Sequence, residues 1–64
     1  MQNGKIKSNG AGHEHKFGFI ETAGGSFKFL AEDYDGDMAS LQFGQRVEFF
    51  EQGGRATNVR LVTL

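Results

Sequence analysis

The sequence contains no cysteine, no proline and no tryptophan. Without cysteine, neither a disulfide framework nor a thiolate metal site can stabilise the chain. No apolar run approaches the roughly 20 residues that a membrane-spanning helix needs, and no signal-peptide pattern opens the sequence. These absences predict a cytoplasmic protein without a membrane segment.

A strong charge of one sign is also lacking, because seven Lys and Arg residues stand against eight Asp and Glu residues, a formal net charge of −1. Proteins that bind nucleic acid are usually basic, since contacts with phosphates supply much of their affinity. Binding to an anionic partner would here depend on a local patch. Lysines outnumber acids four to two in the first 28 residues, whereas residues 32–37 hold four acids and no base.

Groups that carry catalysis are missing as well. There is no cysteine nucleophile, no Gly-x-Ser-x-Gly elbow and no phosphate-binding loop, so we predict neither an enzyme nor a cofactor. His13 and His15 have a spacing that can hold a metal, but two ligands fall short of a closed site. Asp33, Asp35 and Asp37 lack the remaining ligands of a calcium loop. We therefore predict no metal site.

Glycine and phenylalanine are abundant, with ten and seven residues in a chain of 64. Glycine-rich turns between short apolar runs predict strands, at about residues 5–8, 16–22, 26–30, 46–51 and 56–62. The acidic connection at residues 32–40 is the segment that we expect to be partly helical. A chain of this size forms one domain, here residues 1–64, and hides only about 60 % of its unfolded surface.

Side-chain alternation along these strands predicts one buried face. The residues expected to point inward are Ile6, Ile20, Phe27, Phe29, Val47, Phe49, Val59 and Leu61. Five short antiparallel strands can remove their exposed edges by closing into a barrel. The pattern thus predicts an all-β fold built as a five-stranded antiparallel barrel.

Four blocks occur in the order GKIK at residues 4–7, KFGFI at 16–20, LQFGQRVEF at 41–49 and ATNV at 56–59. In this combination the chain resembles the cold-shock domain family over almost its whole length. The resemblance implies a barrel of the OB type that binds single-stranded RNA and DNA by stacking bases on exposed aromatic rings.

The chain also departs from that family at several stacking positions. Typical members carry Trp-Phe where this sequence has Ser8 and Asn9, and an outward Phe and His where it has Lys28 and Leu30. A loop aromatic of the family corresponds to Met38. Part of the aromatic surface implied by the resemblance is therefore absent.

Phe17 and Phe19 are two residues apart on a predicted strand, so both rings project from one face, about 7 Å from each other. Gly18 then faces the opposite side, and Ile20 enters the core. Exposed rings at this spacing suit unstacked bases. The alternative is that both rings are buried and Gly18 faces outward.

Lys7, Lys16 and Lys28 are expected on three neighbouring strands beside these rings, and Arg55 in the last hairpin is a further candidate. A cationic rim around aromatic rings can follow a phosphate backbone. The alternative is an ordinary solvated sheet surface. Protonation of His13 or His15 at acidic pH would add positive charge beside Lys16.

Phe43 and Phe50 do not fit the inward pattern. We expect them to cover the ends of the barrel or to be turned inward by a bulge. Exposed aromatics away from the predicted interface would instead indicate contact with a protein partner.

The function that these residues predict is weak binding of single-stranded RNA or DNA with little sequence preference, by a monomer. The alternative is a degenerate OB-fold barrel that has lost nucleic-acid binding and acts as a protein-interaction module, through Phe43 and Phe50.

Overall fold

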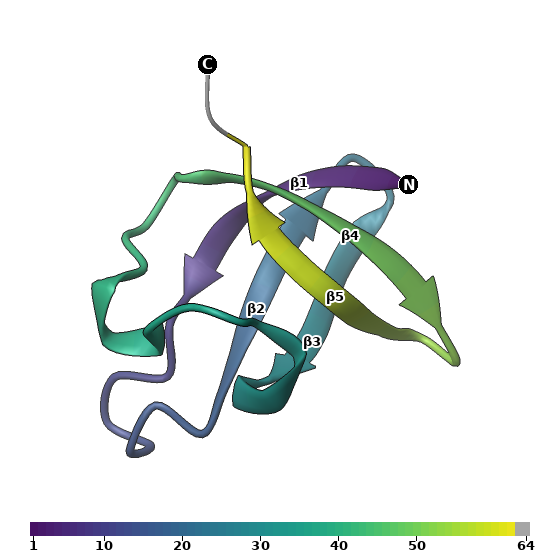
Figure 1. Ribbon diagram of the computed structural model, residues 1–64. Coiled ribbons are helices and arrows are strands. Elements are labelled where there is room, and N and C mark those ends of the chain that lie inside the picture. Colours follow the sequence, from purple (N-terminus) through teal and green to yellow (C-terminus); the bar gives the residue numbers. More distant parts are fainter. Residues whose placement is uncertain (63–64) are drawn as a thin grey trace.

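Five short strands follow one another in the computed structural model, which describes residues 1–62 (Figure 1). The last two residues of the predicted domain, 63 and 64, lie outside the described part. The strands are β1 (Gln2–Ser8), β2 (Phe17–Thr22), β3 (Gly25–Leu30), β4 (Arg46–Gln52) and β5 (Arg55–Leu61). All five predicted strands are present. β1 begins three residues before the predicted start at residue 5, because Gln2, Asn3 and Gly4 pair with β4.

The acidic connection between β3 and β4 holds two single-turn 3₁₀ helices, η1 (Ala31–Asp33) and η2 (Met38–Ser40), so the prediction of partial helicity there is confirmed. The carboxylate of Asp37 accepts a hydrogen bond from the Ala39 amide and begins η2. No helix within residues 1–62 is long and apolar enough to cross a membrane.

The strands close into a barrel in the order β1-β2-β3-β5-β4, with β4 paired to β1. The prediction of an all-β, five-stranded barrel of the OB type is confirmed. Four of the five neighbouring pairs are antiparallel, but β3 and β5 are parallel, so a fully antiparallel barrel was wrong. The reason is topological. An odd number of strands cannot alternate in direction around a closed ring, so at least one pair must be parallel.

The interior of the barrel holds most of the residues predicted to point inward. The largest fully buried side chains are Ile6, Ile20, Phe29, Val47, Phe49 and Val59. Phe27 and Leu61 are partly buried against this core. Tyr34, Met38 and Leu41 from the connection between β3 and β4 join it, so Met38 is a core residue rather than a substitute for an exposed ring.

Candidate nucleic-acid interface

The two aromatic rings of β2 lie on the outside of the barrel. Phe17 and Phe19 are half-buried, while Gly18 and Ile20 are buried. A Cβ atom added to Gly18 would lie 2.5 Å from the Ser8 carbonyl oxygen and 2.7 Å from Cζ of Phe29. The interior has no room for a side chain at this position, so Gly18 faces inward. The alternative with buried rings and an outward glycine is therefore wrong.

The geometry of the two rings differs from a pair of parallel stacking surfaces. Their centroids are 5.9 Å apart and the ring planes meet at 90°, so the edge of one ring packs against the face of the other. Edge-to-face packing is a favourable arrangement of aromatic side chains. Bases stacked on both rings would be turned sharply relative to each other.

Two further side chains contact Phe17. The ring of His13 lies 5.1 Å from the Phe17 ring at a tilt of 36°, and Nζ of Lys28 lies 4.7 Å from its centroid. The second contact is a cation–π interaction. In the β2–β3 pairing Lys28 faces Phe19. We call the surface formed by Lys7, His13, Phe17, Phe19 and Lys28 the binding face.

His13 was considered in the sequence only as a metal ligand or a source of charge, so its place in this face was missed. Glu14 and His15 adopt positive φ values of 58° and 54°, and the Lys16 amide donates to the His13 carbonyl oxygen. This tight turn sets His13 against Phe17. The signal in the sequence was the short turn-forming loop immediately before the first ring.

The positions that lack family aromatics serve to hold this loop. The Ser8 hydroxyl accepts from the Gly10 amide, and the Asn9 side chain accepts from the Ala11 amide. Nδ2 of Asn9 also donates to the carbonyl oxygen of Leu41 at 2.9 Å. These polar side chains fix the path of the loop that presents His13.

The predicted cations differ in their surroundings. Lys7 on β1 and Lys28 on β3 are exposed and lie on the two strands that flank β2. Lys16 lies one residue before β2 rather than within it, and its Nζ is 3.2 Å from the Glu14 carboxylate. Both side chains of that pair are largely exposed, where ion pairs contribute little to stability. Glu14 thus partly neutralises the charge of Lys16.

Arg55 begins β5 and faces Lys28 across the parallel pair of strands. Its Nε lies 3.5 Å from Oδ2 of Asp33, and that carboxylate also accepts from the Leu30 amide at 2.8 Å. Arg55 therefore adjoins the binding face with its charge partly neutralised.

The histidines and aspartates that were considered as metal ligands make other contacts in the described residues. Within the described residues, no three His, Cys, Asp or Glu side chains are placed to hold a metal ion. His13 contacts Phe17, whereas Nδ1 of His15 is 3.0 Å from the carbonyl oxygen of Asn9. Asp33 and Asp37 accept hydrogen bonds from backbone amides.

Phe43 and Phe50 are exposed, by 83 % and 46 %. The prediction that they cover the barrel or turn inward was wrong. Phe43 stands in a turn closed by the hydrogen bond from the Gln45 amide to the Gln42 carbonyl oxygen, which projects the ring outward. The β4–β5 register does shift between Glu48 and Phe50, yet the shift leaves Phe50 outside.

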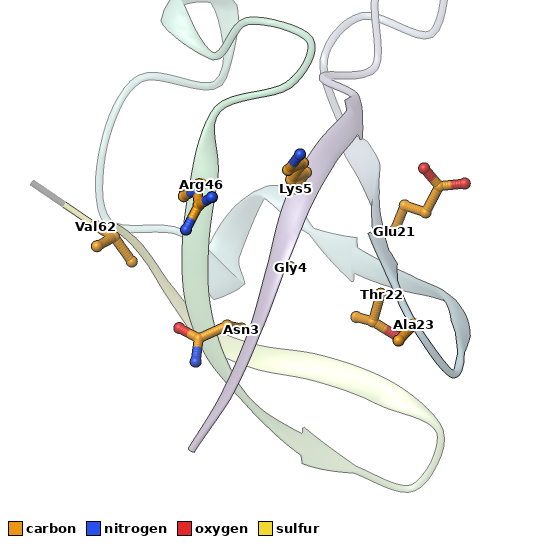
Figure 2. Close-up of a pocket in the computed structure, with 8 residues that line it drawn as sticks. All are labelled: Asn3, Gly4, Lys5, Glu21, Thr22, Ala23, Arg46 and Val62. Atoms are coloured by element: carbon orange, nitrogen blue, oxygen red, sulfur yellow. The ribbon is translucent and has the colours of Figure 1, made fainter.

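A second region of the surface is an open groove of about 550 Å³ between β1, the end of β2 and the start of β4 (Figure 2). Its lining residues are Asn3, Gly4, Lys5, Glu21, Thr22, Ala23, Arg46 and Val62. None of these is aromatic. Lys5 faces Glu21 on one neighbouring strand and Arg46 on the other. We call this region the charged groove.

No protein-family model matches this chain, and no curated protein matches it. The fold and the geometry of the surface are therefore what bear on its function.

Proposed function

We propose that this protein binds single-stranded RNA or DNA at the binding face, in the manner of a cold-shock domain. The observation that carries the proposal is the pair of half-exposed rings, Phe17 and Phe19, held on the outside of β2 beside Lys28. In OB-fold barrels the second and third strands, together with the loops between strands 1 and 2 and between strands 4 and 5, bind oligonucleotides. His13 and Arg55 lie in or next to those loops.

Binding at this face needs no bond chemistry. Bases stack on the rings of Phe17 and Phe19, each contributing about 1–3 kcal/mol, while Lys7 and Lys28 meet phosphates. Every base has a π-face, so stacking discriminates poorly between sequences. The effect on RNA would be to trap unpaired strands and so oppose secondary structure.

The same geometry favours weak binding. A base that stacks on Phe17 competes with the ammonium of Lys28 and the ring of His13, which already contact that ring. The near-neutral chain also supplies no general attraction for phosphates. Affinity should therefore be modest and fall as salt rises.

An amide NMR titration of the isotope-labelled protein with a short oligothymidine at low salt tests the proposal. We expect shifts at Lys7, residues 16–20 and Lys28 that fade as salt rises. Replacing Phe17 and Phe19 together with Ala should weaken binding by about fivefold or more, since at least one stacked base is lost. Phe50→Ala is the matched control, because it removes an exposed ring outside the binding face.

Two results would contradict the proposal. Unfolding of the double variant would show that the rings are structural. An unmoved spectrum of the wild-type protein at millimolar oligonucleotide would show that the face does not bind single strands.

Exposure of Phe43 and Phe50 is the observation that favours the second candidate, a protein-interaction module. Phe43 lies in the turn before β4, and Phe50 lies within that strand. Sedimentation at rising protein concentration tests self-association, and a concentration-independent monomer counts against that form of the candidate.

A further inference from the structure

Phe43 is the most exposed large apolar side chain among the described residues, and the binding face does not include it. Its neighbours in the sequence add no exposed apolar side chain. Gln42 and Gln45 are polar, Gly44 has no side chain, and Leu41 is buried. A protein-docking surface usually needs a contiguous apolar patch of several hundred Å². A lone ring at the tip of a turn suits a single flat ligand better.

The turn that carries Phe43 is fixed to β1. The Gly44 amide donates to the Ile6 carbonyl oxygen at 2.7 Å, and the Ile6 amide donates to the Gln45 carbonyl oxygen at 2.8 Å. Nδ2 of Asn9 donates to the Leu41 carbonyl oxygen. Figure 1 shows this connection passing the carboxyl end of β1 before β4 begins.

These bonds place the segments of the outer surface in a definite order. The turn at residues 41–45 lies on one side of β1, and β2 lies on the other side, where Ser8 pairs with Phe19. Neighbouring strands are about 4.8 Å apart, so the turn lies about 10 Å from β2 across the surface. Lys7, between Ile6 and Ser8, stands on the intervening strand and is exposed.

We propose that Phe43 stacks a further base of the same single strand, so that the strand runs from the rings of β2 over Lys7 to this turn. The inference rests on the proposed function and extends its site. About 10 Å corresponds to about three nucleotides at the charge spacing of one duplex strand, which is about 3.4 Å per nucleotide. Lys7 would then meet a phosphate between the base on Phe19 and the base on Phe43.

Length dependence tests this inference. Affinities of wild type, Phe43→Ala and Phe50→Ala would be measured at low salt for a thymidine trinucleotide and a thymidine octanucleotide. We expect Phe43→Ala to weaken the affinity for the octanucleotide by about fivefold or more and to leave the affinity for the trinucleotide unchanged. Phe50→Ala should change neither affinity. In the wild type, the Gly44 amide should shift with the octanucleotide only.

Failure of the inference is separable from failure of the proposed function. Suppose that wild type binds both oligonucleotides, and that Phe43→Ala either has the same affinities or loses affinity equally for both lengths. The proposed path over Lys7 is then wrong, while binding at the binding face is unaffected. If wild type binds neither oligonucleotide, both proposals are wrong. If Phe43→Ala alters only sedimentation, Phe43 is a protein contact and the inference is overturned.

Discussion

The outer surface of the barrel carries two regions along β1 and β2, the binding face and the charged groove, and their side chains differ. At the binding face, Phe17 and Phe19 are half-exposed beside Lys28, and the nearest facing residue on β1 is Ser8. In the charged groove, Lys5 faces Glu21, and no aromatic side chain is among the lining residues (Figure 2). Both regions carry lysine. The two regions differ in what surrounds the lysine: Lys28 lies against the ring of Phe17, whereas Lys5 faces the acid Glu21.

The largest expected effect comes from Gly18, whose inward position allows rings on both sides of it to face outward. Gly18→Val would press a branched side chain against the Ser8 carbonyl and the Phe29 ring. We expect a loss of about 1–3 kcal/mol in the free energy of unfolding, as for other overpacked cores. Thermal or urea unfolding measures this loss.

Gly24→Ala is the control for that substitution, because its added Cβ would meet nothing closer than Oγ1 of Thr22 at 3.8 Å. It should change stability by no more than about 0.5 kcal/mol. Equal stability of the two variants would show that the interior does not require glycine at position 18.

Replacing one lysine in the binding face and one in the charged groove sharpens the comparison. Lys28→Gln removes a cation that contacts Phe17, whereas Lys5→Gln removes one from the charged groove. We expect Lys28→Gln to weaken oligothymidine binding and to reduce the slope of log affinity against log salt by about 0.7, the contribution of one phosphate contact to a single strand. Lys5→Gln should leave both quantities unchanged. An equal loss at the two positions would mean that charge alone directs binding.

Arg55→Gln should have a smaller effect, because Asp33 already partly neutralises this guanidinium. We expect less than about a threefold loss of affinity and less than about 1 kcal/mol of stability, as for partly exposed ion pairs. Titrations run beside those of Lys28→Gln measure the difference. A larger loss for Arg55 than for Lys28 would move the centre of the interface towards the turn between β4 and β5.

Strands and core could be predicted because bulky apolar residues alternate with polar ones over short runs. Ile6, Ile20, Val47 and Phe49 are buried as that alternation requires. The direction of Phe17 and Phe19 was left open by this alternation, and the lack of space for a side chain at Gly18 decides it.

Other features depend on backbone conformation, on side-chain packing or on contacts between distant segments, none of which the alternation of residue types contains. The place of His13 depends on two non-glycine residues with positive φ, an uncommon backbone conformation. The exposure of Phe43 depends on a turn bonded to β1. The edge-to-face angle of Phe17 and Phe19 is set by side-chain packing, and strand rise alone predicts only their separation.

The parallel contact between β3 and β5 has a consequence for local opening of the barrel. It rests on one facing pair, Lys28 and Arg55, with a further bridge between Tyr34 and Val59. Like charges placed opposite each other destabilise strand pairing, although Asp33 offsets part of this repulsion. Amide hydrogen exchange should therefore be faster along this contact than between β2 and β3. A polyanion lying across the contact between β3 and β5 would screen the two cations and slow that exchange. Binding of such a ligand would then reduce local opening of the barrel.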